Sequence, residues 1–390
     1  MKFRLYPILL LAAMLFVACE SGDNGSYGNL GGDDSRGEAG NIENPTTPDV
    51  EYIYPGKQWD YATFEECGYK DCSEEIVSYL KSYSDVTSLC VVVGGKMMYE
   101  YGDMESTYYL ASARKSICSM LYGIAVDRGI IDLSTTIGEL IEQGIIDEDL
   151  DEGDIKGLLD IEKRATIEHC ISARSGVYHQ ASNTGSTLDD PSKVPARGSV
   201  EPGTRYMYSN WDFNVAGAIL DGYMGEKMYD MFEREIAQPL QFENWDRTIH
   251  SYGGDTSKSI YPAYHFKLTA RDMARIGYLM LRKGKWAHGE QIISEEWIAK
   301  STSVISTRQE TGNTRFGYGY MWWVFNNNSS QYPAELQDIY AANGSGGQFI
   351  VVAPQIDMVL VIKRNKDVLA DSWNLSRPYY LLEKIYKNRL

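Results

Sequence analysis

The sequence predicts a mixed α/β fold of the α+β type, in which a central antiparallel sheet is flanked by helices and carries an inserted helical subdomain. Three observations predict this fold. Two apolar runs, residues 89–93 and 96–101, flank Gly94–Gly95 in the pattern of a strand, a tight turn and a strand. Residues 349–352 and 358–362 repeat that pattern near the C-terminus. Helical periodicity dominates between the two pairs, so one sheet built from both chain ends is expected to enclose the helices.

Local signals place individual elements along the chain. Ser73 precedes an acidic first turn, which predicts a helix that begins there with the serine as its cap. A helix is expected from Ser112 to Gly129, because apolar residues recur on one face and a glycine ends the run. A last amphipathic helix is expected over residues 379–390. Two further helix starts have the spacing of a capping box: Thr136 with Glu139, and Thr269 with Asp272.

The first 50 residues have the layout of an exported lipoprotein. A short positive start precedes the apolar run 5–18, which is too short for a membrane span of about 20 residues and is typical of a secretory signal. A small residue precedes Cys19, so the segment resembles a bacterial lipobox. It predicts a signal peptide over residues 1–18 and lipid on Cys19, with an ordinary signal peptide cleaved nearby as the alternative. Residues 19–50 are rich in Gly, Ser, Asn, Asp and Pro and are expected to be a flexible tether to one domain, residues 51–390.

Composition and charge limit the possible partners. The 390 residues include 37 Lys and Arg against 54 Asp and Glu, a net charge of −17. This acidic balance argues against a nucleic-acid partner and against loose adsorption to an anionic membrane. With 43% hydrophobic and 23% charged residues, the composition is that of an ordinary globular protein. An enzyme, a small-ligand binder and an adhesive surface protein all remain open.

The cysteines predict no metal site. Lipid on Cys19 would leave five of the six cysteines, and Cys67 and Cys72 are close enough in sequence to bridge in an oxidising compartment. The other three lie in apolar stretches and are expected to be buried fillers: Cys90, Cys118 and Cys170. No metal-ligand spacing joins any cysteine to one of the five histidines.

The acidic run 147–152 lacks calcium-loop spacing and is expected to be a solvated loop.

Three short motifs carry the candidate chemistry. Ser112 and Lys115 lie three residues apart on a predicted helix and so share a face, and a serine attacks only where a base such as a desolvated lysine takes its proton. Tyr208 and Asn210 belong to a Tyr-Ser-Asn triplet before another predicted helix. A phenol can relay a proton there, and an amide can hold the lysine or a substrate amide. Residues 341–348 form a glycine-rich strand edge that presents N–H groups to a substrate.

In order and context, these motifs resemble the penicillin-recognising serine hydrolases, in the branch related to class C β-lactamases that includes DD-peptidases, esterases and amide hydrolases. The likeness covers residues 60–390. It includes sequence segments outside the three motifs or around them, which are residues 165–176, 201–210, 268–275 and 316–323. The resemblance implies a β-lactamase/transpeptidase-like fold. It also implies that Ser112 attacks a carbonyl and forms an acyl-enzyme, while Lys115 and Tyr208 act as a coupled pair of proton carriers.

The resemblance also assigns residues that would contact the substrate: Asn210, Asn343, Gly344 and Ser345. It implies an oxyanion hole made by the backbone N–H groups of Ser112 and Ser345. The family's third motif usually begins with Lys or His, whose charge holds a substrate carboxylate, but Ala342 stands at that position. This departure favours esters, amides or peptides without that carboxylate, unless another cation substitutes, and predicts weak or no β-lactamase activity.

Together these observations predict an exported, lipid-anchored serine hydrolase that needs no metal or organic cofactor. The expected partners are a small-molecule or peptide substrate and, through Cys19, a membrane; no nucleic acid and no protein partner are implied. The expected location is the bacterial cell envelope, on the periplasmic side or at the cell surface, with the outer membrane favoured. The alternative is a catalytically silent lipoprotein of the same fold that binds cell-wall or glycan fragments in the cleft.

Overall fold

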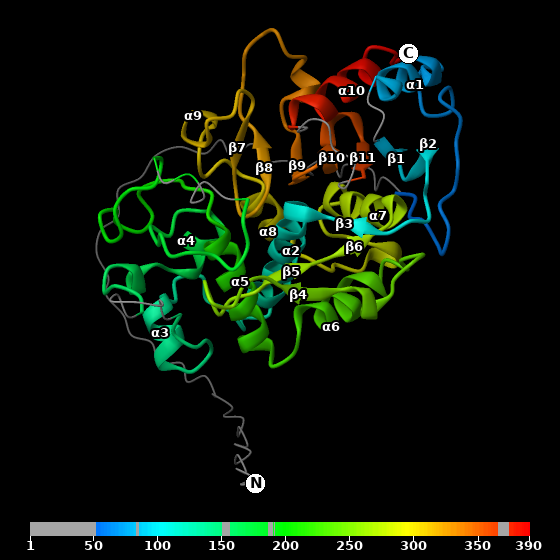
Figure 1. The fold of residues 1–390 in the computed structure, drawn as a ribbon. Helices are drawn as coiled ribbons and strands as arrows, with labels where there is room; N and C mark the ends of the chain where they lie inside the picture. The colour runs from blue at the N-terminus through cyan, green and yellow to red at the C-terminus, as the bar shows by residue number, and fades with distance from the viewer. Residues whose placement is uncertain (1–51, 83–85, 150–156, 186–189, 191, 366–373) are drawn as a thin grey trace, which may run out of the picture. The chain divides into compact units, whose positions relative to one another are not determined.

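A seven-stranded antiparallel sheet forms the centre of the protein (Figure 1). The computed structural model describes residues 52–82, 86–149, 157–185, 190, 192–365 and 374–390. The predicted signal peptide, the lipid site and the tether lie outside these residues. The strands of the sheet follow the order β2-β1-β11-β10-β9-β8-β7, and every neighbouring pair is antiparallel. They span β1 Val86–Val93, β2 Lys96–Gly102, β7 Phe316–Tyr318, β8 Trp323–Phe325, β9 Tyr340–Gly344, β10 Gln348–Ala353 and β11 Met358–Arg364.

Helices cover both faces of this sheet. Their bounds are α1 Ser73–Lys81, α2 Arg114–Asp127, α3 Ile137–Glu142, α4 Ile167–Ile171, α5 Asn210–Met224, α6 Met228–Phe232, α7 Ala270–Leu281, α8 Glu295–Ser301, α9 Arg308–Thr311 and α10 Ser376–Tyr386. Two short ladders lie among them, one pairing β3 Tyr108–Tyr109 with β6 Lys267–Leu268 and one pairing β4 Ser251–Gly253 with β5 Ala263–His265. Helices α2 to α6 fall between β2 and β7 in sequence, which confirms the predicted sheet with an inserted helical region.

Alternating side chains of the central strands supply two separate cores. On β1, Leu89 and Val91 pack with the apolar faces of α1 and α10, whereas Cys90 and Val92 pack with α7. This alternation follows from the two-residue period of a strand, and burial on both faces explains the nearly continuous apolar sequence of β1, β10 and β11. In Figure 1, α1 and α10 lie beside each other on one face of the sheet, and α7 lies on the other.

Turns and caps follow the sequence signals with two differences. The hairpin turn between β1 and β2 has left-handed backbone at both Gly94 and Gly95, as a tight connection requires. Thr136 and Glu139 form the complete predicted capping box. Ser73, by contrast, is not the cap of α1: Cys72 occupies the cap position, and the Asp71 carboxylate accepts the Ser73 N–H at 2.8 Å.

The second predicted capping box is only half formed. The Thr269 hydroxyl accepts the Asp272 N–H at 3.1 Å and so caps α7. The Asp272 carboxylate, however, does not accept the Thr269 backbone N–H that would complete the box. It accepts the backbone N–H groups of Glu243 and Asn244 instead, at 2.8 and 3.3 Å. The cap therefore also fastens the segment after α6 to the start of α7.

The cysteines divide by burial. Cys90, Cys118 and Cys170 are fully buried, as predicted for small apolar fillers. Cys67 and Cys72, for which a bridge was open from the sequence, are free thiols in the structure.

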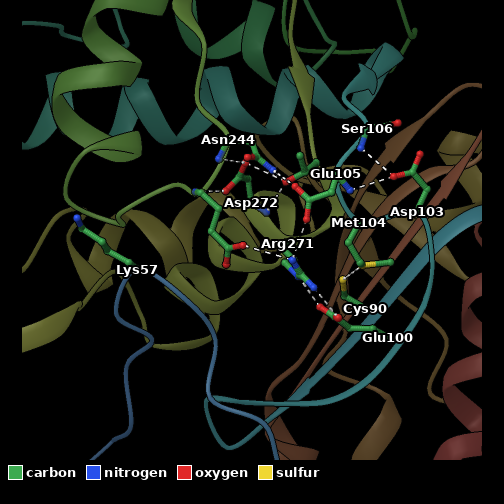
Figure 2. A network of polar contacts seen from close by, with 12 residues as sticks. Lys57, Cys90, Glu100, Asp103, Met104, Glu105, Ser106, Asn244, Arg271 and Asp272 are labelled. Atoms are coloured by element: carbon green, nitrogen blue, oxygen red, sulfur yellow. Dashed lines mark hydrogen bonds and ion pairs between the residues drawn. The ribbon is translucent and has the colours of Figure 1, made fainter.

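A polar network fixes the chain that runs from β2 toward Ser112 (Figure 2). Arg271, at the start of α7, donates from Nε and Nη2 to the two carboxylate oxygens of Glu100 at 2.7 and 2.9 Å, and from Nη1 to Glu105 at 3.2 Å. The Asp103 carboxylate accepts the N–H groups of Glu105 and Ser106 at 3.0 Å each. Arg271 therefore holds the end of β2 and the 103–106 turn against α7, and the Asp103 bonds close the turn before the chain enters β3.

The residues that the structure describes include no helix that is long and apolar enough to cross a membrane. They also contain no group of three or more His, Cys, Asp or Glu side chains placed to hold a metal ion.

Candidate active site

Ser112 lies in a tight turn that leads directly into the buried helix α2. Residues Ala111–Ala113 form one turn of 3-10 helix, and Ala111 has a left-handed φ of 47°, which is strained for a residue with a Cβ. The Arg114 guanidinium reaches back and donates from Nη1 to the Ala111 carbonyl at 3.1 Å. The strained turn is therefore held from the helix that follows it, and it presents the half-buried Ser112 at the N-terminal end of that helix.

The Lys115 amine joins the first two motifs. Its Nζ lies 3.3 Å from Ser112 Oγ, 2.7 Å from the Tyr208 hydroxyl and 2.8 Å from Asn210 Oδ1. It also lies 4.1 Å from the ring centres of both Tyr208 and Phe213. Lys115 is only 1% exposed. Side chains from two segments that are more than 90 residues apart in sequence, the Ser112 turn and the start of α5, therefore meet around one buried nitrogen.

Burial and a neighbouring charge set the protonation of this nitrogen. Loss of hydration disfavours the charged amine, and the adjacent Arg114 cation adds to that effect. Together they hold the pKa of Lys115 well below its ordinary 10.5, against a smaller opposing effect of the Asp212 carboxyl group. Burial also raises the pKa of Tyr208 to about 12, against smaller effects of a hydrogen bond with Ser112 and the charge of Arg114. The two groups are thus shifted toward a neutral amine beside a neutral phenol.

The Tyr-Ser-Asn motif takes its position from the start of α5. The Ser209 hydroxyl accepts the Trp211 N–H at 3.2 Å and caps the helix, which places Asn210 in its first turn. The Asn210 side chain uses both ends of its amide: Oδ1 accepts from Lys115, and Nδ2 donates to the Thr184 carbonyl at 2.8 Å. Tyr208 is held among aromatic rings, with Phe213 at 4.8 Å and Trp323 stacked at 6.1 Å.

The third motif forms the end of β9 and packs directly against the Ser112 turn. Gly344 has no room for a side chain, because a Cβ there would overlap the Leu110 carbonyl oxygen and lie 3.2 Å from Ala113 N. This close approach explains why glycine stands at the position. Asn343 is half-buried on β9, where it pairs with Phe349, and Ala342 is fully buried in the core. Ser345 is exposed in the turn that follows.

A cavity of about 500 Å³ opens over Ser112. The residues that line it are Tyr109, Ala111, Ser112, Arg114, Asn183, Thr184, Gly185, Asn210, His265 and Ser345. Of the residues expected to contact a substrate, Asn210 and Ser345 are in this lining, whereas Asn343 and Gly344 are not. Lys115 and Tyr208 lie behind the cavity wall and reach it through Ser112 and Asn210.

Two residues that contribute to the site were missed by sequence reasoning. Arg114 stands between Ser112 and Lys115, lines the cavity and is only 3% exposed. Asp149 belongs to the acidic run predicted to be a solvated loop, and for this residue the prediction was wrong. It is fully buried and accepts Trp211 Nε1–H at 2.9 Å, Ile260 N–H at 3.0 Å and the Ser259 hydroxyl. Asp149 thereby pins Trp211, the residue after Asn210, and no local signal in the acidic run marks that long-range contact.

Comparison with known proteins agrees with this architecture. Residues 85–383 match the beta-lactamase family. Among solved structures, the fold is similar to a family VIII carboxylesterase (15% identity, TM-score 0.58, covering 85% of this chain and 99% of that one). It is also similar to a penicillin-binding protein homologue from Pyrococcus abyssi (16% identity, TM-score 0.57, covering 82% of this chain and 78% of that one). A third similar structure is a beta-lactamase from Mycobacterium bovis (18% identity, TM-score 0.52, covering 81% of this chain and 100% of that one). The family match spans most of the chain, and the chain therefore belongs to the beta-lactamase family, within the serine hydrolase superfamily.

Proposed function

We propose that the protein hydrolyses an ester, amide or peptide bond through an acyl-enzyme at Ser112. The observation that carries this proposal is the buried Lys115 amine, which lies within hydrogen-bond distance of Ser112 Oγ, the Tyr208 hydroxyl and Asn210 Oδ1. A serine needs a base to become a nucleophile, and a lysine serves as one only when it is uncharged. Burial beside Arg114 favours that uncharged form.

The proposed first half-reaction starts with Lys115 as the base. Its lone pair accepts the Ser112 proton while Ser112 Oγ bonds to the substrate carbonyl carbon. The scissile bond then breaks, and the proton passes from Lys115 by way of the Tyr208 hydroxyl to the leaving alcohol or amine. In the second half-reaction the route runs in reverse: Tyr208 and Lys115 take a proton from a water molecule, whose oxygen bonds to the acyl carbon. The bond from that carbon to Ser112 Oγ then breaks, the proton passes from Lys115 to Ser112 Oγ, and the acid is released. The pKa of Tyr208, about 12, favours a phenol that relays a proton over a phenolate that acts as the resting base.

Two backbone N–H groups are proposed to hold the oxyanion. They belong to Ser112, at the start of the turn into α2, and to Ser345, at the end of β9 across the same cavity. The packing of Gly344 against Leu110 and Ala113 supports this pairing, because it fixes the distance between the two segments. Loss of one such donor typically removes about 3 kcal/mol of transition-state stabilisation.

The neutral third motif shapes the proposed substrate range. Ala342 is buried and uncharged where the family usually carries Lys or His, so β9 offers no side-chain cation to a substrate carboxylate. We therefore expect weak or no β-lactam turnover and better turnover of simple esters or amides. The similarity in fold to a carboxylesterase is compatible with this range.

The export and anchoring of the protein are part of the same proposal. Cys19 would carry lipid and hold the domain at the bacterial cell envelope, on the periplasmic side or at the cell surface. A catalytically silent binding protein is the second candidate, and the neutral Ala342 is the observation that favours it, because a family cation is missing from the cleft.

Active-site labelling distinguishes the two candidates. The domain, residues 51–390, is treated with a fluorophosphonate, and its intact mass is compared with that of the Ser112→Ala variant. The enzyme predicts one adduct on the parent protein and none on the variant. Absence of an adduct with fluorophosphonates and with activated esters of several sizes would overturn the proposal in favour of the silent binder.

A further inference from the structure

The Arg114 side chain is buried beside Ser112 without its full set of partners. It is 3% exposed, its guanidinium carbon lies 5.1 Å from the centre of the Tyr264 ring, and Nη1 donates to the Ala111 carbonyl. Within the part of the chain that the structure describes, Nε and Nη2 have no hydrogen-bond partner, and no carboxylate lies within ion-pair distance of the group. A buried cation in that condition is costly, because removal from water is not offset by hydrogen bonds or by an opposite charge.

The two unpartnered nitrogens form one edge of the guanidinium. Nε and Nη2 carry parallel N–H bonds on the same side of the plane, which is the arrangement that grips both oxygens of a carboxylate. Nη1, on the other edge, is occupied by Ala111. The side chain is thus braced at one edge, and the edge suited to a planar anion is unpartnered but buried, so an anion reaches it only with a shift of the guanidinium toward the cavity.

The position of Arg114 places such an anion in the cavity of the nucleophile. Arg114 lines the cavity together with Ser112, Tyr109 and His265, and its stacking partner Tyr264 precedes His265 on β5. Ala342 lies elsewhere, buried on β9, so an anion at Arg114 would not occupy the place of the usual family carboxylate.

We propose that Arg114 is the anion-binding residue of this cavity, and that the substrate carries a carboxylate close to its scissile carbonyl. That the anion belongs to a substrate rests on the proposed hydrolase activity. That Arg114 binds an anion does not depend on that activity. An anion at Arg114 would lie on the side of the cavity lined by Tyr109 and His265, so the site would favour an anionic ester or amide over a neutral one. β-Lactams would still lack the contact that the Lys or His of the third motif usually makes with their carboxylate.

Direct binding tests the site without catalysis. The Ser112→Ala protein is titrated with benzoate and with the neutral isostere benzamide, and binding is followed by calorimetry and by NMR. We expect benzoate to bind at least 10-fold more tightly than benzamide, and Arg114→Met in the same background to abolish that difference. The matched control is Arg128→Met, which removes one cation at the other end of α2, where Arg128 is paired with Glu235 and largely exposed. Equal binding of benzoate and benzamide would overturn the inference.

Turnover then tests whether the anion belongs to the substrate. Two matched pairs place the charge on the acyl or on the leaving side: 4-nitrophenyl hydrogen adipate with its methyl ester, and 3-acetoxybenzoate with its methyl ester. Arg114→Met should lower the anionic-to-neutral ratio of kcat/KM for one pair by about 10- to 100-fold, the range expected for a bidentate charged contact. Arg114→Lys, which keeps the charge but not the fork, should lower it by a smaller factor, and it also serves as the readout if the methionine variant does not fold.

The outcomes separate this inference from the proposed activity. A fall in kcat/KM that is equal for both members of each pair would mean that Arg114 only braces the Ser112 turn, and would overturn the inference while the hydrolase remains. Selective benzoate binding with no turnover of any ester would retain the anion site and refute the hydrolase.

Discussion

Gly344→Ala tests the contact that brings β9 to the Ser112 turn. A Cβ at this position would lie 2.9 Å from Gln348 Cβ, whereas carbon atoms normally approach to about 3.5–4.0 Å, and it would also overlap the Leu110 carbonyl oxygen. Relief of these contacts requires a movement of roughly 1 Å between the two segments. Leu110 O accepts the Ala113 N–H at 3.1 Å, so that movement loosens the turn that holds Ser112. A misplacement of this size can lower a rate by about 100-fold, and such overpacking typically destabilises a protein by about 1–3 kcal/mol.

The assay for this variant is kcat/KM on an activated ester, with unfolding in urea measured in parallel. Gly56→Ala is the matched control, because a Cβ at that position would meet nothing within 4 Å. We expect Gly344→Ala to remain mostly folded at the assay temperature, so that the unfolded fraction accounts for only a small part of its loss in kcat/KM. Gly56→Ala should keep the kcat/KM and the unfolding free energy of the parent. Activity of Gly344→Ala within threefold of the parent would refute the view that this contact sets the geometry of the site.

The remaining predictions concern proton transfer, packing and anchoring. If neutral Lys115 is the base, kcat/KM rises with pH through its lowered pKa, because the charged amine cannot accept a proton, and then stays level to at least pH 9, because Tyr208 loses its proton only near a pKa of about 12. A rate that keeps rising tenfold per pH unit up to pH 10 would instead indicate a Tyr208 phenolate as the base. Asp149→Asn places an amide N–H opposite the donors that now bind a carboxylate, and it should lower the unfolding free energy by about 1–3 kcal/mol. Asp255→Asn, at an exposed site, is the control. An unchanged urea midpoint for Asp149→Asn would contradict the view that Asp149 holds Trp211 in place. Cys19→Ser should release the full-length protein from membranes on cell fractionation, and full retention would count against lipidation.

Local pattern predicted that Ser112 and Lys115 lie close together, and the two further motifs in order made them candidates for catalysis. Ser112 lies in the 3-10 turn that runs into α2 and Lys115 in the first turn of α2, so a spacing of three residues is enough to bring their side chains together. The hairpin at Gly94–Gly95 was equally predictable, because a two-residue turn with left-handed backbone leaves few alternatives to glycine.

Long-range contacts decided the rest. Asp149 looks like one more charge in a solvated run, and only its burial against Trp211 and Ile260 reveals a structural role. Arg114 gives no sequence signal either, because its unpartnered guanidinium edge depends on how Tyr264 and Ala111 close around it. Gly344 was expected from the sequence only to contact substrate, and its packing against Leu110, a contact between two segments more than 200 residues apart, needed the structure.

The central claim is that Ser112 carries the acyl group during turnover. Its most direct test is rapid quenching of a reaction with 4-nitrophenyl acetate, followed by intact mass measurement and peptide mapping of the adduct. The account predicts a transient gain of one acetyl group on the peptide that contains Ser112, formed at the rate of the 4-nitrophenol burst and absent from Ser112→Ala. An acetyl group located on another residue, or ester hydrolysis at the parent rate by Ser112→Ala, would contradict it.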